Sequence, residues 1–317
     1  MAVDTKTLRF EFLADTKKFL GKIGRVGKSF DALGKDMNRV GGQINKVFAG
    51  IGLAAGAVAT KALTEFRSFE DGMNEVFTLM PGITSDAMDK MSGDILKISK
   101  EIGKLPEEVI PSLYNSLSAG VPPGNVFDFL ETANKLAVGG ATDLGTAVDG
   151  LTTVVNAFGA DVIDVGTASD QIFTAVKGGK TTVDELSKSL FQVAPVAAGL
   201  GVEFGDVTAA LATLTAAGTP TSVAATQLRA VFSELSKPTT VVSKLFQKLS
   251  GKDFASFIAS GGNVADALGL IKKEADKNGV SLSAYFGSVE AAGAAQVLTG
   301  KGAEKFAAEL KAAGEAA

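Results

Sequence analysis

The sequence has 317 residues, of which 46% are hydrophobic and 21% are charged, and its formal net charge is −4. This length and composition are typical of a folded chain with one large domain or two small ones, and they exclude a disordered chain. The sequence contains no Cys and no His, which excludes disulfides, thiol and histidine catalysis and nearly all zinc sites.

The chain begins with a short alternating segment. Leu8, Phe10 and Phe12 alternate with the charged residues Arg9 and Glu11, which predicts a strand within residues 1–14. The first 18 residues lack the apolar core of a signal peptide, so we expect a protein made and used without Sec export.

From Asp15, which is typical of a helix N-cap, apolar residues recur at alternating spacings of four and three. This heptad pattern predicts a long coiled-coil-like helical segment over residues 15–83, with a change of register at Lys61. The residues that we expect to form a self-association seam are Phe19, Ile23, Val26, Phe30, Leu33, Met37, Val40, Ile44, Val47 and Ile51. A second seam follows at Phe66, Phe69, Met73, Val76 and Met80.

Residues 47–60 are uncharged and contain Gly52 and Gly56 at the spacing that lets two helix backbones approach closely. Fourteen apolar residues are fewer than the roughly 20 that a bilayer requires, so a buried helix contact is the simpler interpretation. Contact with a membrane in some functional state stays open. Residues 1–46 hold ten Lys/Arg and five Asp/Glu, so this arm is either a solvated helix face or a surface for nucleic acid or an acidic protein wall.

Residues 84–300 show helices of about a dozen residues separated by Gly- and Pro-containing loops, which predicts a compact multi-helix domain. The expected helix starts are at Pro106, at Asp143, at a capping box of Thr182 and Glu185, at Thr219-Pro220 and at Asn263. Residues 301–317 are expected to begin a further helix or to form a tail. The predicted fold class is therefore all-α, after the short N-terminal strand.

Three of the expected helices end in similar sequences, LYNSLSAG, LTTVVNAFG and LATLTAAG. We interpret each ending as small residues followed by a C′ glycine, at Gly120, Gly159 and Gly218. The similarity is too weak to define a repeat.

Two segments resemble a phosphate-binding loop, residues 24–29 (GRVGKS) and residues 177–182 (KGGKTT). That loop needs a glycine five residues before the Gly of its Gly-Lys-Ser/Thr, and these positions hold Lys22 and Thr174. We therefore expect no nucleotide binding, and no other cofactor or metal.

Acidic pairs such as Asp161 with Asp164, or Glu107 with Glu108, are most simply interpreted as helix starts that complement the helix dipole. A carboxylate pair for glycoside hydrolysis stays open, because its geometry is set in three dimensions. The chain is nevertheless predicted not to be an enzyme.

Residues 109–240 resemble the core region of phage tail tape measure proteins. The similar stretches, in order, are SLYNSLSAGV, LAVGGATDLGTAVDGLTTVVNAFG, DQIFTAVKGGKTTVDELSKSLFQVAPVAAGLGVEF and AALATLTAAGTPTSVAATQLRAVFSELSKPTT. The resemblance implies a structural protein inside the virion tail that is assembled in the host cytoplasm, templates the length of the tail tube and is released at genome ejection. It also implies as partners further copies of the chain in a trimer or hexamer, the tail tube protein, tail assembly chaperones and tail-tip or baseplate hub proteins, with transient membrane contact and no sequence-specific nucleic-acid binding.

The chain is shorter than most members of that family, so it is expected to be either a fragment or the product of a short tail. Because short helices joined by turns fold back on one another, we expect residues 84–298 to be a docking or folding module. The measuring length is then expected in the N-terminal helix or beyond Ala317. Two alternatives stay open: a membrane-active helical protein that forms or aids a translocation pore, and a wall hydrolase.

Overall fold

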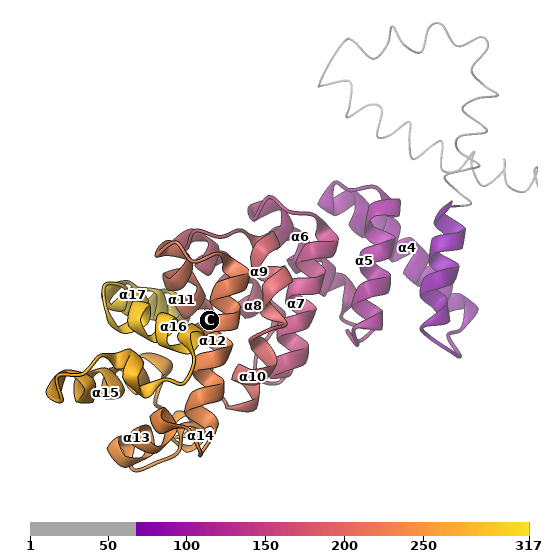
Figure 1. The fold of residues 1–317 in the computed structure, drawn as a ribbon. Coiled ribbons are helices and arrows are strands. Elements are labelled where there is room, and N and C mark those ends of the chain that lie inside the picture. The colour runs from indigo at the N-terminus through magenta and orange to yellow at the C-terminus, as the bar shows by residue number, and fades with distance from the viewer. Residues whose placement is uncertain (1–67, 317) are drawn as a thin grey trace, which may run out of the picture. The chain divides into compact units, whose positions relative to one another are not determined.

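The computed structural model describes residues 68–316 of the chain, and every regular element in that part is helical (Figure 1). The predicted strand lies outside the described residues, as does the long predicted helix up to residue 67. The described elements are the helical residues 68–78, α4 (Ser85–Ile102), α5 (Pro106–Ser118), α6 (Val126–Gly139), α7 (Leu144–Phe158), α8 (Val165–Gly178), α9 (Val183–Leu190), α10 (Ala194–Gly199), α11 (Phe204–Ala216), α12 (Thr221–Ser236), α13 (Val241–Ser250), α14 (Phe254–Ala259), α15 (Val264–Lys277), the 3₁₀ turn η1 (Leu282–Tyr285), α16 (Val289–Thr299) and α17 (Ala303–Glu315).

The helix starts follow the cap chemistry expected from the sequence. Pro106 opens α5, and the side chains of Asp143, Thr182 and Asn263 each accept a hydrogen bond from a first-turn amide of α7, α9 and α15. The three similar endings belong to α5, α7 and α11, and their glycines adopt φ angles of 94°, 93° and 99°. An L-residue rarely adopts such φ values, which explains why glycine ends each helix. The predictions of these helices are confirmed, with one difference: Gly120 and Gly218 occupy the predicted C′ position, whereas Gly159 is the C-cap residue of α7.

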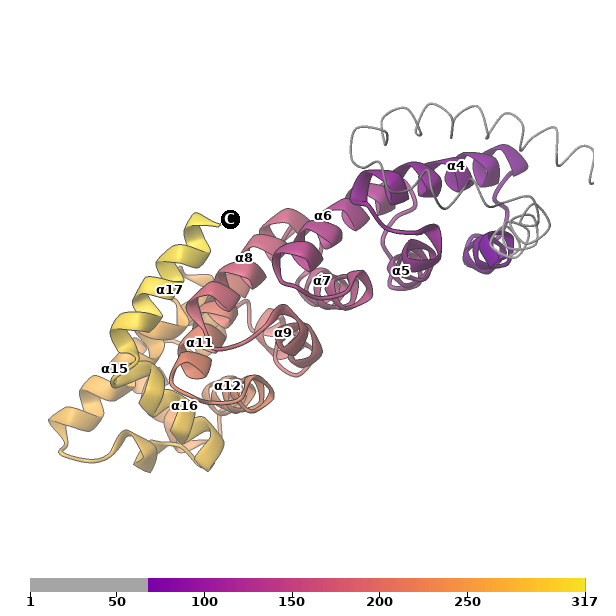
Figure 2. The same cartoon turned by 90° about the horizontal axis from the view of Figure 1, so that it is seen from above.

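Helices α4 to α12 form two layers, visible as two rows in Figure 2. Layer A contains α4, α6, α8 and α11, and layer B contains α5, α7, α9 and α12; each helix packs against the next one in its own layer and against its partner in the other layer. Helix α10 follows α9 after a break at residues 191–193. Pro195, in the first turn of α10, has no backbone N–H to donate to the carbonyl four residues earlier, so α9 does not continue into α10.

Successive helices within a layer run in the same direction. In layer B, the side-chain amide of Asn156 at the end of α7 donates to the carbonyl of Ala119 at the end of α5, at 2.8 Å. In layer A, the amide of Lys180 just after α8 donates to Oγ1 of Thr215 near the end of α11, at 3.2 Å. The chain therefore alternates between two layers of parallel helices.

The C-terminal helices close this arrangement. Helix α16 packs on α12, and α17 packs on α11 and α8. The carboxylate of Glu234 near the end of α12 accepts hydrogen bonds from the amides of Gly287 and Ser288, at 2.7 and 2.9 Å, so α16 begins where α12 ends. The residues predicted as a further helix or a tail thus contribute α17, whose Phe306 and Ala313 are buried.

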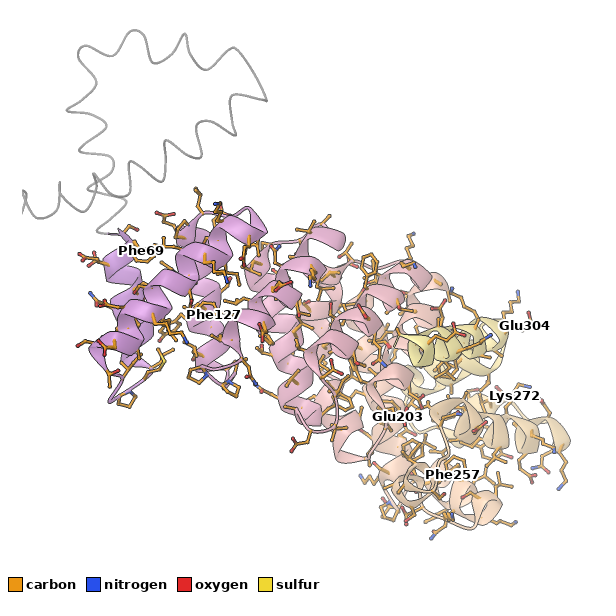
Figure 3. All side chains as sticks on the ribbon, turned by 180° about the vertical axis from the view of Figure 1, so that it is seen from behind. Phe69, Phe127, Glu203, Phe257, Lys272 and Glu304 are labelled. Atoms are coloured by element: carbon orange, nitrogen blue, oxygen red, sulfur yellow. The ribbon has the colours of Figure 1, made fainter. Side chains whose placement is uncertain are left out.

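Aromatic side chains hold α12, α13 and α14 together. The ring of Phe254 lies 6.3 Å from that of Phe232 and 5.9 Å from that of Phe246, measured between ring centroids. Phe257, labelled in Figure 3, meets Phe246 edge to face at 5.2 Å. Such offset and edge-to-face pairs are favoured over face-to-face stacking, and they hold α14 against α12 and α13.

The second predicted seam lies partly in the described region. Met73 and Val76 are buried in the common core, and Phe69 and Met80 pack against it. A Cβ placed on Gly72 would lie 3.0 Å from Cγ2 of Ile110, so residues 68–78 pack closely on α5. These residues therefore face the helical array, although they precede the domain boundary proposed at residues 83 and 84.

Candidate functional site

The predicted self-association seam, from Phe19 to Ile51, lies outside the described residues. The close-packing glycines Gly52 and Gly56 lie there too, as does the loop-like segment at residues 24–29. These predictions stay predictions. Among the helices that the structure describes, none is long and apolar enough to span a bilayer.

The phosphate-loop candidate at residues 177–182 is a helix-packing loop between α8 and α9. A Cβ on Gly179 would lie 3.0 Å from Cα of Ala212 and 2.9 Å from the carbonyl oxygen of Ala175, so glycine is required for close packing. The amide of Lys180 donates to Oγ1 of Thr215, and Thr182 caps α9. The backbone amides of Gly179 and Lys180 in this loop therefore donate within the fold.

Three of the four acidic residues lie at helix starts, as expected, whereas Asp161 lies in the turn that precedes α8. Glu107 and Glu108 occupy the first turn of α5, and Asp164 caps α8 by accepting hydrogen bonds from the amides of Gly166 and Thr167. The hydrogen bonds from Thr167 hold the pKa of Asp164 below its usual value, so this carboxylate is ionised at neutral pH. Within residues 68–316, no group of three His, Cys, Asp or Glu side chains is placed to hold a metal ion.

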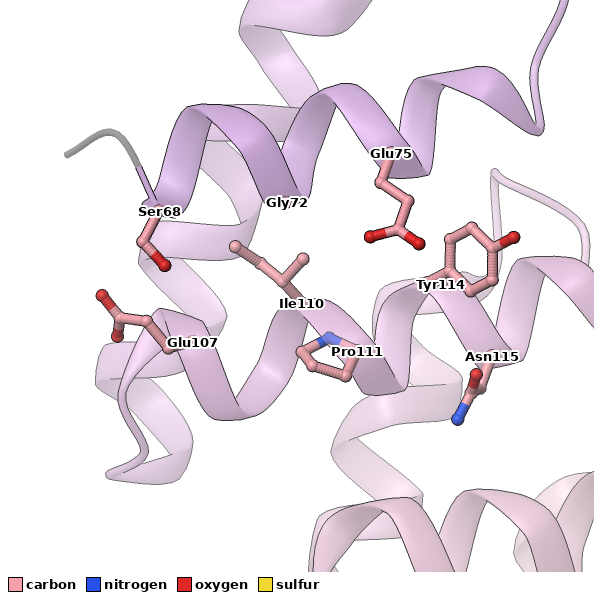
Figure 4. A pocket seen from close by; sticks show the side chains of 8 residues that line it. All are labelled: Ser68, Gly72, Glu75, Glu107, Ile110, Pro111, Tyr114 and Asn115. Atoms are coloured by element: carbon pink, nitrogen blue, oxygen red, sulfur yellow. The ribbon is translucent and has the colours of Figure 1, made fainter. Parts of the chain in front are cut away.

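A hollow of about 390 Å³ lies between residues 68–78 and α5 (Figure 4). Its lining includes Gly72 and Glu75 on one side and Glu107, Ile110 and Tyr114 on the other. The two carboxylates have the same charge, and the rest of the lining comes from Ser68, Pro111 and Asn115. The hollow lies at the edge of layer B.

A larger groove, of about 700 Å³, lies where the α5–α6 and α7–α8 loops come together. Phe129 and Ile163, both buried, contribute to its lining, and Asp128 and Asp164 are exposed there. The Asn156 amide on this lining is engaged by the Ala119 carbonyl. The groove therefore combines apolar surface with two exposed acidic side chains.

Four buried side-chain oxygens in the described part have no hydrogen-bond partner, those of Ser99, Asn134, Gln171 and Ser187. None of these residues lines either hollow. They lie within helices α4, α6, α8 and α9, where successive helices pack. These four side chains are therefore buried by the packing of helices against one another.

Sequence reasoning missed one buried charge. Asp206, in the first turn of α11, is 8% exposed, and its Oδ2 accepts a hydrogen bond at 2.8 Å from the amide of Val264, the first residue of α15. Burial is the main cause that raises the pKa of Asp206 to about 6; the hydrogen bond from the Val264 amide opposes the rise, and the nearby carboxylates of Glu203 and Asp266 add to it. Only the contact with α15, distant in sequence, distinguishes this carboxyl from an ordinary first-turn Asp.

Asp206→Asn is expected to stabilise the protein at pH 7.5. Because the pKa rises from 3.8 to about 6 on folding, the group favours the folded state fully below pH 3.8 and loses that contribution as pH rises through 6. Asparagine keeps an acceptor for the Val264 amide without the buried charge, so we expect a gain of about 2–3 kcal/mol at pH 7.5. Urea unfolding at pH 4.5 and 7.5 measures this gain in stability. The control is Asp170→Asn, at an exposed position. Equal gains from Asp206→Asn at both pH values would contradict the raised pKa of Asp206.

The described residues form a helical scaffold of two packed layers that is closed by α16 and α17. The family model described as phage-related minor tail protein matches residues 92–296, from within α4 to within α16. The chain belongs to this family of phage tape measure proteins, which confirms the resemblance seen in the sequence. These are structural proteins, and the matched region contains no enzymatic domain.

Two relatives show how far the similarity extends. The chain is 33% identical over 310 residues to a probable tape measure protein of Clostridium phage phiCD119, which covers 94% of this chain and 32% of that protein. It is 23% identical over 230 residues to a tape measure protein of Pneumococcus phage Dp-1, which covers 70% of this chain and 20% of that protein. The chain thus spans about a third of the length of the Clostridium phage protein and a fifth of the length of the Pneumococcus phage protein. No solved structure matches it.

Proposed function

We propose that this protein acts as a phage tail tape measure protein, which templates tail tube assembly and length inside the tube lumen and leaves the tube at genome ejection. The observation that carries the proposal is the family match over residues 92–296, which includes most of the two-layer helical array and continues into α16. The proposed location is the interior of the virion tail, after assembly in the host cytoplasm.

Its proposed partners are further copies of the chain, the tail tube protein, tail assembly chaperones and tail-tip or baseplate hub proteins. The names of the two relatives support a place in the tail. The helical array supports a docking or folding role for residues 84–300, because its interior is filled by helix packing and its exposed faces are available for contact. We propose no catalytic activity, no cofactor and no sequence-specific nucleic-acid binding.

Deletion of the gene from its phage tests the proposal. Electron microscopy of the resulting particles is expected to show heads with absent or disordered tails, and expression of the intact protein in trans is expected to restore uniform tails. Particles with normal tails in the absence of the protein would exclude a role in tail assembly.

The alternative is a membrane-active helical protein, favoured by the uncharged segment at residues 47–60. Liposome leakage by the purified chain separates the two functions. Leakage at low protein-to-lipid ratio together with normal tails in the deleted phage would favour the alternative over the tape measure role.

Self-association through the N-terminal seam is a separate prediction, since a solvated monomer should not leave such an apolar stripe exposed. Phe30→Asp combined with Leu33→Asp places two charges at the seam centre and is expected to reduce the oligomeric mass measured by light scattering. The control adds the same charge beside the seam, with Ser29→Asp and Ala32→Asp. Unchanged mass in the seam variant, with its helicity retained, would contradict the prediction.

A further inference from the structure

The helices of each layer begin at nearly constant intervals. In layer A the N-cap residues are separated by 41, 39 and 39 positions; they are Thr84, Asn125, Asp164 and Glu203. In layer B the intervals are 38, 39 and 38 positions; the N-caps are Leu105, Asp143, Thr182 and Pro220. A constant period of this size is typical of tandem helix-pair repeats.

The same positions of each layer B helix are buried. Eight residues after the N-cap the residue is leucine in all four helices, and all four side chains are fully buried: Leu113, Leu151, Leu190 and Leu228. Four residues after the N-cap the buried residues are Val109, Ala147, Leu186 and Ala224, and at eleven residues they are Ser116, Val154 and Val231. In the third unit this position is Val193, which is also buried but lies just after the end of α9. Positions four, eight and eleven fall on one helix face, so each unit presents the same face to the core.

Layer A shows the same pattern from α6 onward. Eight residues after the N-cap the buried residues are Ala133, Ile172 and Leu211, and eleven residues after it they are Leu136, Ala175 and Leu214. The residue types differ between units while the burial repeats. The periodicity therefore belongs to the packing rather than to residue identity.

Contacts between neighbouring units also recur at equivalent positions. In α7, the residue seven positions after the N-cap is Gly150, and a Cβ there would lie 2.9 Å from Cβ of Ser187, five positions after the N-cap of α9. Gly72 meets Ile110 of α5, also five positions after an N-cap, in the same way. Residues 68–78 thus relate to α5 as α7 relates to α9.

We propose that residues 84–236 are four successive copies of one helix-pair unit with a period of about 39 residues, preceded by residues 68–78 as the second helix of a fifth unit. Each unit buries its apolar face mainly against its neighbours, as in other helical repeat proteins. Helices α13 to α17 end the array, since α16 begins where α12 ends and α17 covers α11. The inference is independent of the function proposed above.

The test compares two deletions in the full chain. Deleting residues 126–164 removes α6 and α7, one whole period, and joins Asn125 directly to Val165, so that α8 follows α5 with the original loop. Deleting residues 126–143 removes only α6 and its loop, which joins α5 to α7 and breaks the alternation of layers. We expect the 39-residue deletion to keep the helicity per residue and a single cooperative thermal transition, and the 18-residue deletion to lose the cooperative transition.

A tandem duplication of residues 126–164 provides a second variant, which adds one unit in register. Cooperative folding of either 39-residue variant, together with failure of the 18-residue deletion, supports the repeat. Failure of both 39-residue variants overturns it, and so does an 18-residue deletion that folds as well as they do. Circular dichroism and gel filtration of the purified proteins distinguish these outcomes.

Discussion

Replacement of Gly150 by leucine is expected to separate α7 from α9 and to destabilise the protein by about 3 kcal/mol. A Cβ at this position would lie 2.9 Å from Cβ and 3.3 Å from Cα of Ser187, so the backbone of α9 itself would have to move. Urea unfolding is expected to show a lower midpoint. Because α7 also contacts α5, α6 and α8, the displacement should extend to neighbouring units.

Gly93→Ala is the matched control. Gly93 lies inside α4, is exposed, and would place its Cβ within 4 Å of nothing outside its own helix backbone. Alanine there is expected to stabilise the helix by about 0.5–1 kcal/mol, since glycine lowers helix stability wherever no close contact requires it. If Gly150→Leu were neutral, or if the two substitutions shifted the midpoint in the same direction, the close approach of α7 and α9 would not be a determinant of stability.

Helix boundaries could be predicted from the sequence because their causes are local. Asp143 and Asn263 bond amides within the next three residues, and Pro238 prevents continuation of α12. The glycine endings of α5, α7 and α11 depend only on a positive φ at one residue. All of these signals act within one turn of helix, so they can be recognised from residues that are close together in the sequence.

The repeat could not be predicted in this way. The similar endings that the sequence shows belong to α5, α7 and α11, and α11 lies in the other layer. Their similarity therefore does not follow the true period. What recurs is burial at equivalent positions. In layer B, serine at position 116 corresponds to valine at position 154, and of the buried positions compared only the leucine eight residues after the N-cap keeps its identity.

The charged contacts also required the fold. Thr182 accepts the Glu185 amide as the capping box predicts, but the Glu185 carboxylate accepts a hydrogen bond from Thr221 of α12 at 2.8 Å. Asp206 is likewise defined by α15, 58 residues further along the chain. The candidate self-association site is a different case, because it rests on heptad spacing in residues outside the described region.

The last prediction concerns tail length. A ruler segment made of continuous helix gains about 1.5 Å per residue, so loss of 39 residues from it should shorten a tail by about 58 Å. In the two-layer array each unit adds instead roughly one interhelix distance, about 10 Å. Residues 84–236 would therefore contribute little length even if the folded array were aligned with the tube axis.

Phage carrying the deletion of residues 126–164 are accordingly expected to form either tails of normal length or no tails, depending on whether the shortened array still docks on its partners. The control is a deletion of 39 residues from a continuous heptad segment of the same phage's tape measure, which should shorten tails in proportion. Electron microscopy of purified particles gives both distributions of length. Uniform, infectious particles with tails about 58 Å shorter would show that residues 126–164 act as an extended ruler in the tail, and the docking role assigned to the array would be wrong.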